Sequence, residues 1–168
     1  MPQEDMTEEF QKAKKRVCDA AHRFAESDLA AGTWGNISTR IDDTYFACTP
    51  SGRDYKELTP EDIPIVNMHD LSHEGLKPTK EKNFHAMIYQ DRDEVNAIIH
   101  SHSMNASTVA AARRDLPPVL DDQAQILGPN VRCAEYAIPG TKSIAKKVLK
   151  SIKRRNAVLL ANHGAVVV

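Results

Sequence analysis

The amino-acid sequence predicts a single α/β domain. Short apolar or alternating segments, typical of strands, interleave along the chain with segments whose apolar residues recur every three or four positions, as in amphipathic helices. The 168 residues are enough to bury one core. No repeat, linker or low-complexity stretch divides them, so we expect one domain over residues 1–168.

The expected elements follow the chain in a regular order. A helix is expected over 5–28, because Phe10, Val17 and Phe24 fall on one face, and Gly32 would stop it. Turn residues and apolar runs then predict strands at 37–41, 44–48 and 63–68, a capped helical turn at 59–62, a helix at 82–90, a strand from Ala97 through His100 and His102, a helix at 103–112, a loop at 117–123, a strand at 131–138, a helix at 142–153, and a strand pair around 162–164.

Composition excludes several classes of function. The net charge of −1 gives no electrostatic case for nucleic acid as the main partner. No apolar run approaches membrane-spanning length, and the acidic, polar N-terminus is not a signal peptide. Cys18, Cys48 and Cys133 are odd in number and widely spaced, which indicates reduced thiols in the cytoplasm rather than metal ligands.

Two histidines end the apolar run Ala97-Ile98-Ile99. Side chains alternate along a strand, so His100 and His102 are expected on one side, and His163 follows another apolar run sixty-one residues later. Three neutral imidazoles are a ligand set of catalytic zinc. A lone histidine at a strand end is more often a core residue, and such pairs arise by chance, but the matching context of His163 favours a metal site. His69 and His73 are expected in an exposed loop and His85 in the core.

Small-residue turns and carboxylates supply further candidates. The backbone N–H groups of residues 32–38 and 49–52 could cradle an anion, although ordinary turns explain both segments equally well. Glu81 precedes the expected helix at 82–90, where a carboxylate is favourable in any case. Asp121 and Asp122 are acid/base candidates that the sequence alone assigns to solvent.

Five of these motifs occur in a recognisable order. Together they resemble the class II aldolase/adducin-head family, to which L-fuculose-phosphate aldolase and L-ribulose-phosphate 4-epimerase belong. The resemblance runs from the first helix to the last residue. The motifs are Gly35-Asn36-Ile37-Ser38, Thr49-Pro50-Ser51-Gly52, Pro78-Thr79-Lys80-Glu81, His100-Ser101-His102 and Asn162-His163-Gly164.

The resemblance implies a three-layer α/β/α domain around a largely antiparallel sheet, usually in a fourfold-symmetric homotetramer with active sites near subunit interfaces. It implies that His100, His102 and His163 hold a divalent metal, usually Zn²⁺, and that Glu81 is the acid/base carboxylate. The residues it assigns to the substrate phosphate are Thr33, Gly35, Asn36, Ser51, Gly52 and Thr79.

This sequence departs from the family pattern at three places. The family's serine-rich turn before the glutamate appears here as Thr79-Lys80, and Lys80 could pair with the phosphate or simply replace a neutral donor. Asp121 stands about where some aldolases carry an aromatic acid, which is closer to the epimerase pattern, and is a second catalytic candidate. The sequence ends at Val168, where family members usually continue into further helices, so we expect either a fragment or a naturally short form.

The expected activity is that of a zinc-dependent lyase. It would cleave a small phosphorylated ketose to dihydroxyacetone phosphate and an aldehyde, with the metal stabilising the enediolate. The alternatives are 4-epimerisation, dehydration of a methylthioribulose phosphate, a non-catalytic scaffold like the adducin heads, and a carbonic-anhydrase-like hydratase. The presence of all three histidines and Glu81 argues for chemistry.

Overall fold

A computed structural model describes residues 3–29 and 34–168 of the chain. In this part of the chain, eight strands form one sheet in the order β4-β3-β2-β1-β5-β8-β7-β6. Their bounds are Asn36–Arg40 (β1), Tyr45–Cys48 (β2), Ile65–Asn67 (β3), His73–Glu74 (β4), Ala97–Ser101 (β5), Arg132–Ala134 (β6), Ala157–Leu160 (β7) and Gly164–Val167 (β8). Neighbouring strands pair antiparallel except β6 and β7, which confirms the largely antiparallel sheet.

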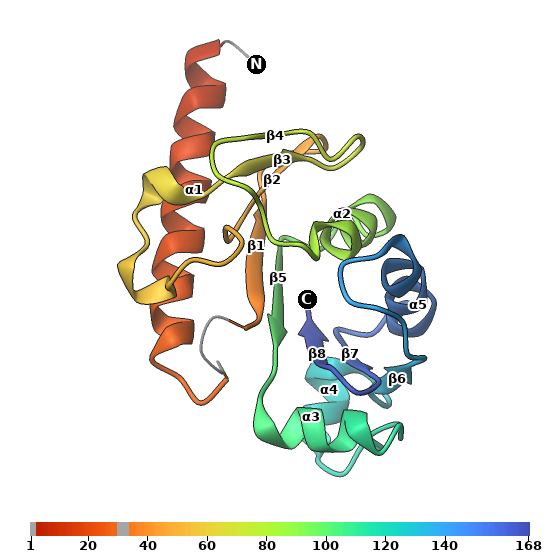
Figure 1. The fold of residues 1–168 in the computed structure, drawn as a ribbon. Helices are drawn as coiled ribbons and strands as arrows, with labels where there is room; N and C mark the ends of the chain where they lie inside the picture. Colours follow the sequence, from red (N-terminus) through yellow and green to blue (C-terminus); the bar gives the residue numbers. More distant parts are fainter. Residues whose placement is uncertain (1–2, 30–33) are drawn as a thin grey trace.

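Helices cover both faces of this sheet, as Figure 1 shows. They are α1 (Gln3–Ala25), α2 (Lys82–Asp91), α3 (Met104–Ala111), α4 (Asp121–Leu127) and α5 (Lys142–Ile152), with short 3₁₀ turns at Tyr55–Glu57 and Pro60–Asp62. Helix α1 lies on one side, and α2 and α5 lie on the other. The expected three-layer arrangement is confirmed.

The alternation of side chains along each strand separates the two apolar layers. On one face, Val17 and Phe24 of α1 pack with Ile37 of β1. On the other, α2 and α5 pack with Ile98, Val158 and Val166, and Phe84 of α2 is fully buried. In β7, Leu159 points away from the layer that holds Val158 and packs with Ala110 of α3. Helix α3 therefore shares a face of the sheet with α1.

Two short elements were not expected: strand β4, which contains His73 where the sequence predicted a loop, and the 3₁₀ turn at Tyr55–Glu57. Two expected elements differ from the structure. The expected loop at 117–123 contains the start of α4, where Asp121 and Asp122 lie in the first turn and favour the positive end of the helix dipole. The expected strand at 131–138 is only three residues long, because Ala134 pairs with Leu160, the last residue of β7. Beyond that point the edge strand has no partner to continue the ladder.

The remaining elements confirm the predicted order, with ends shifted by a few residues. The expected helix stop at Gly32 lies outside the described residues. Among the described residues, no helix combines the length and apolar character needed to cross a lipid bilayer.

Candidate metal centre

His100 lies in the middle of the site, on the central strand β5. It is fully buried and faces α2, where its ring lies nearly perpendicular to that of Phe84, with centroids 5.7 Å apart and an interplanar angle of 82°. Its Nδ1–H donates to the carbonyl oxygen of Ala165 on β8, at 2.9 Å. This bond fixes the tautomer and leaves the Nε2 lone pair available to a metal.

The other two histidines reach the same point from strand ends. His102 follows β5, and its Nε2 lies 2.9 Å from Nε2 of His100. His163 lies in the turn between β7 and β8, which its own N–H closes by donating to Leu160 O at 2.9 Å. Asn162 before it has a φ of 59°, a left-handed conformation that asparagine tolerates. The ligand nitrogens of the three rings all lie within 4.8 Å of one another.

Two glycines allow the backbone to come this close. A Cβ on Gly164 would lie 2.3 Å from the carbonyl oxygen of Ser101. A Cβ on Gly35, where φ is +93°, would lie 2.6 Å from the carbonyl oxygen of His100. Neither position accepts a side chain without moving the strand that carries the histidines.

Burial keeps these imidazoles in the form that binds metals. Desolvation lowers the pKa of His100 to about 3 and that of His163 to about 4. It also lowers the pKa of His102, which is only half-buried. The three rings are therefore neutral at neutral pH, and each can offer a nitrogen lone pair.

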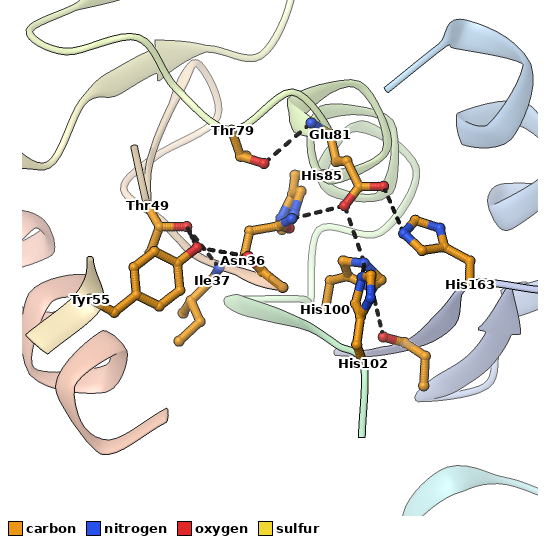
Figure 2. Close-up of polar contacts among 12 residues, drawn as sticks. Asn36, Ile37, Thr49, Tyr55, Thr79, Glu81, His85, His100, His102 and His163 are labelled. Carbon is orange, nitrogen blue, oxygen red and sulfur yellow. Dashed lines mark hydrogen bonds and ion pairs between the residues drawn. The ribbon is translucent and has the colours of Figure 1, made fainter. Parts of the chain in front are cut away.

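Glu81, at the N-terminal end of α2, completes the cluster (Figure 2). Its Oε2 lies 3.2 Å from His100 Nε2, and its Oε1 lies 3.6 Å from His163 Nε2. Oε2 also accepts a hydrogen bond from Asn36 Nδ2 at 2.9 Å. Oε1 is buried without a hydrogen-bond partner in the described residues, as is Nδ1 of His163.

This donor set fits a divalent cation. Nitrogen lone pairs and carboxylate oxygens converge, and their mutual burial is unfavourable unless a positive charge lies between them. Three imidazoles with an adjacent carboxylate match the nitrogen and oxygen preference of zinc and similar metals. The residues that would hold the ion are His100, His102 and His163, with Glu81 beside it.

A cavity of about 510 Å³ opens onto the cluster. It brings together most of the residues that the sequence singled out, with Gly35, Asn36, Ser51, Gly52, Thr79, Lys80, Glu81, His102 and His163 in its wall. Five further lining residues were not among the candidates, namely Pro50 of the turn at 49–52, Trp34, Tyr55, Pro139 and Gly140. Trp34 could have been noticed as an aromatic residue inside a glycine turn, whereas no sequence signal marked Tyr55, Pro139 or Gly140.

Hydrogen bonds connect the two small-residue turns beside this cavity. The Tyr55 hydroxyl, buried with its ring, donates to Gly35 O at 2.7 Å, and its oxygen lies 3.1 Å from Thr49 Oγ1, whose hydrogen it can accept. Thr49 O in turn accepts from Thr79 N–H at 3.0 Å. The N–H of Ser51 already donates to Lys77 O, so what Ser51 can offer an anion is its hydroxyl.

Other predicted residues lie elsewhere. Asp121 is exposed at the start of α4 and does not line the cavity, and Thr33 falls outside the described residues. His69 and His73 are exposed, and His85 is fully buried, as expected.

A larger hollow of about 610 Å³ lies between α2 and α5 and is unrelated to this cluster. It is lined by basic side chains of α5 and the turn after it, including Lys146, Lys150 and Arg154, and by no histidine. Its size alone does not make it the functional site, because the convergent polar groups lie in the smaller cavity.

Known proteins share both the sequence pattern and the fold. A sequence profile of the class II aldolase and adducin N-terminal domain matches residues 15–168. A 5-deoxy-D-ribulose 1-phosphate aldolase from Bacillus thuringiensis serovar kurstaki is 39% identical over 159 residues, which cover 94% of this chain and 74% of that protein. The L-fuculose phosphate aldolase of Escherichia coli K12 is 32% identical over 158 residues, covering 94% of this chain and 73% of that enzyme.

A solved L-fuculose 1-phosphate aldolase superimposes with a TM-score of 0.86 at 35% identity, covering 93% of this chain and 74% of the other. Family profile, relatives and fold agree. The chain belongs to the class II aldolase and adducin N-terminal domain family.

Proposed function

We propose that this chain is a zinc-dependent aldolase that cleaves a small phosphorylated ketose, of the L-fuculose-1-phosphate type, to dihydroxyacetone phosphate and an aldehyde. The observation that carries the proposal is the convergence of three neutral imidazoles and Glu81 beside one cavity, with Glu81, His102 and His163 in its wall. The relatives named as aldolases of 5-deoxyribulose 1-phosphate and fuculose phosphate support this reaction class.

The reaction needs one proton removed and one added. The hydroxyl on the carbon that becomes the aldehyde loses its proton, and the adjacent carbon–carbon bond breaks. The electron pair stays on the phosphate-bearing fragment, which is then protonated at carbon. A bound divalent cation supplies Lewis-acid stabilisation of the negative charge that develops on this fragment.

Glu81 is the proton carrier that we assign on this chain. Its Oε2 is held by Asn36, whereas Oε1 has no hydrogen-bond partner in the described structure and is available for proton transfer. Asp121, exposed on α4, is proposed as a second acid/base group. Because Asp121 does not line the cavity of its own chain, it could act only in the active site of a neighbouring subunit. We therefore expect active sites that are shared between subunits.

The phosphate is proposed to bind where the small-residue turns meet the cavity. Lys80 is exposed at its wall and supplies a positive charge, and Thr79 stands next to it. Gly35, Asn36, Ser51 and Gly52 complete the proposed set, with Thr33. Holding the phosphate there would fix the reacting carbons relative to Glu81.

A homotetramer in the cytoplasm is proposed for the assembled enzyme. Large apolar side chains are exposed on α3, on α4 and before it, including Met104, Leu120 and Ile126, and they supply surface for subunit contacts. Free thiols at all three cysteines are consistent with a reducing compartment. Light scattering of the purified chain measures the assembly state.

The test combines metal analysis with product analysis. Purified chain is assayed for zinc and then offered L-fuculose 1-phosphate, 5-deoxyribulose 1-phosphate, L-ribulose 5-phosphate and methylthioribulose 1-phosphate. Dihydroxyacetone phosphate is followed by coupled reduction, and inversion or dehydration by NMR. About one metal ion per chain with release of dihydroxyacetone phosphate is expected. A metal-loaded chain that cleaves none of these sugars would refute the aldolase.

Variants assign the roles. Glu81→Gln should keep the metal and lose about 10²–10⁴-fold in kcat, the usual contribution of a general acid or base. His69→Gln, on the exposed loop, is the matched control and should leave both unchanged. Full activity of Glu81→Gln would remove Glu81 from the mechanism.

A further inference from the structure

A buried chain of polar side chains leads away from Glu81 into the core. Its members come from two elements, with Glu81, His85 and Tyr89 on α2 and Asn36 and Ser38 on β1. His85, Tyr89 and Ser38 are fully buried, and Asn36 is 4% exposed. Such a network in an apolar layer is costly unless every member is bonded, so its bonds define what it does.

Each link has a short distance. Asn36 Nδ2 lies 2.9 Å from Glu81 Oε2, and Asn36 Oδ1 lies 2.5 Å from His85 Nε2. His85 Nδ1 lies 2.7 Å from Ser38 Oγ, which is also 2.7 Å from the Tyr89 hydroxyl. Figure 2 shows the contact of Asn36 with Glu81, with the His85 side chain close to Asn36.

The carboxylate fixes the direction of every bond. Oε2 of Glu81 accepts, so the amide of Asn36 donates to it and turns its carbonyl oxygen toward His85. His85 must then carry its proton on Nε2, and its bare Nδ1 accepts from the Ser38 hydroxyl. Tyr89 donates to Ser38 at the far end. All donors in the chain therefore point toward Glu81.

The ring of His85 is also held in place. It is stacked on Phe84, with centroids 4.6 Å apart and an interplanar angle of 20°, and lies nearly parallel to Phe46 at 6.4 Å and 10°. Burial lowers its pKa to about 3, so the ring stays neutral and keeps a single donor.

From this geometry we infer that His85 is a positioning residue, which holds Asn36 so that Asn36 fixes the Oε2 end of the Glu81 carboxylate and leaves Oε1 for proton transfer. The inference rests on the proposed aldolase function for its effect on turnover. In this inference His85 contacts neither substrate nor metal, and its Nε2–H has the specific task of holding the carbonyl oxygen of Asn36.

Two substitutions separate this task from simple packing. A glutamine places an amide nitrogen near the position of Nε2 and can still donate to Asn36, whereas an asparagine reaches only the position of Nδ1. His85→Asn should lower kcat by about 10–100-fold, the usual effect of losing a partner behind a functional group, while the metal stays bound and KM changes less. His85→Gln should recover most of that loss.

The control is His22→Gln, because His22 is a half-buried histidine on α1 whose Nε2 bonds Leu58 O, far from the site. Its kcat should stay within about twofold of the unchanged chain. Wild-type kcat in His85→Asn would overturn the inference. Equal losses in His85→Asn and His85→Gln would also overturn it, since they would indicate packing alone.

A readout without turnover keeps the two proposals distinct. Nitrogen-15 NMR of the full chain should show His85 as the Nε2–H tautomer, without titration from pH 8 to pH 5, and a crystal structure of His85→Asn should show Asn36 turned away from Glu81. An Nδ1–H tautomer, or an unmoved Asn36, would overturn the inference. If the unchanged chain cleaves no sugar phosphate, the proposed function fails, and these two measurements still decide the role of His85.

Discussion

Gly164→Ala tests how the metal centre depends on the approach of two strands. The φ of Gly164 is not in the left-handed region, so alanine is conformationally allowed there, and the cost is steric. The new Cβ would lie 2.3 Å from Ser101 O, whereas real Cβ contacts begin near 3.0 Å. Strands β5 and β8 must therefore separate by about 0.7 Å. Overpacking of this kind costs about 1–3 kcal/mol of stability.

The separation should cost metal affinity as well. Gly164 adjoins His163, and Ser101 lies between His100 and His102, so the shift moves the ligand sets of the two strands apart. Metal–ligand distances tolerate only about 0.2 Å, so we expect zinc to bind at least 10-fold more weakly. Competition with a chromophoric chelator measures the affinity, and thermal unfolding of the metal-free chain measures the stability.

Gly75→Ala is the matched control for this experiment. Gly75 has a φ of +82°, and its Cβ would meet only Pro64 Cα at 3.7 Å. Alanine there should cost about 1–2 kcal/mol of backbone strain and leave zinc affinity unchanged. Equal zinc affinity in Gly164→Ala and the unchanged chain would refute the steric reasoning.

Three further predictions concern the site and its support. His100→Ala should abolish stoichiometric zinc binding, whereas the control His69→Ala should keep it. Elemental analysis of the two purified proteins measures the zinc content, and zinc retained by His100→Ala would contradict the assigned ligand set. Acid should destabilise the chain through His85, because burial lowers the pKa of its ring to about 3 in the folded protein, against about 6.5 for a histidine in an unfolded chain. The unfolded state therefore takes up the extra proton, and the stabilisation that is present above pH 6.5 is lost as the pH falls toward 3. Denaturant titrations between pH 6 and pH 4 should therefore give His85→Gln a shallower fall in unfolding free energy than the unchanged chain, by up to about 1.4 kcal/mol per pH unit, and equal slopes would argue against a buried neutral ring. Tyr55→Phe should lower the free energy of unfolding by about 1–3 kcal/mol, because it leaves Gly35 O without its donor, and chemical denaturation measures this change.

The sequence predicted the fold well where local pattern and tertiary environment agree. The helix expected at 82–90 is present as α2 with its end shifted by one residue, and the strand expected from Ala97 is present as β5, although it ends at Ser101, before His102. The start of α4 was missed because Pro117, Pro118 and two aspartates resemble a loop, although the same aspartates favour a helix N-terminus. The length of β6 could not be predicted, since it depends on where its neighbour β7 ends.

The residues of the site divide in the same way. Strand alternation already places His100 and His102 on one side, His163 follows a second apolar run, and the structure brings the nitrogens of all three together. Tyr55 and Pro139 reach the cavity from separate loops, and their positions depend on long-range packing that no local pattern encodes. The catalytic role of Asp121 stays a prediction, because its side chain faces solvent in the single chain.

The polar network behind Glu81 can be recognised in the sequence only when a helix periodicity and a strand periodicity are considered together. Glu81, His85 and Tyr89 recur every four residues, the spacing of one helix face, and Asn36 and Ser38 are two apart, the spacing of one strand face. Each pattern alone is ordinary, and only the packing of α2 against β1 makes the two polar stripes meet. A buried polar network that is only partly bonded is less stable than an apolar core. This network is bonded at every step from Tyr89 to Glu81, and all of its bonds are directed toward the carboxylate. Its burial is therefore explained by the need to hold that carboxylate in place.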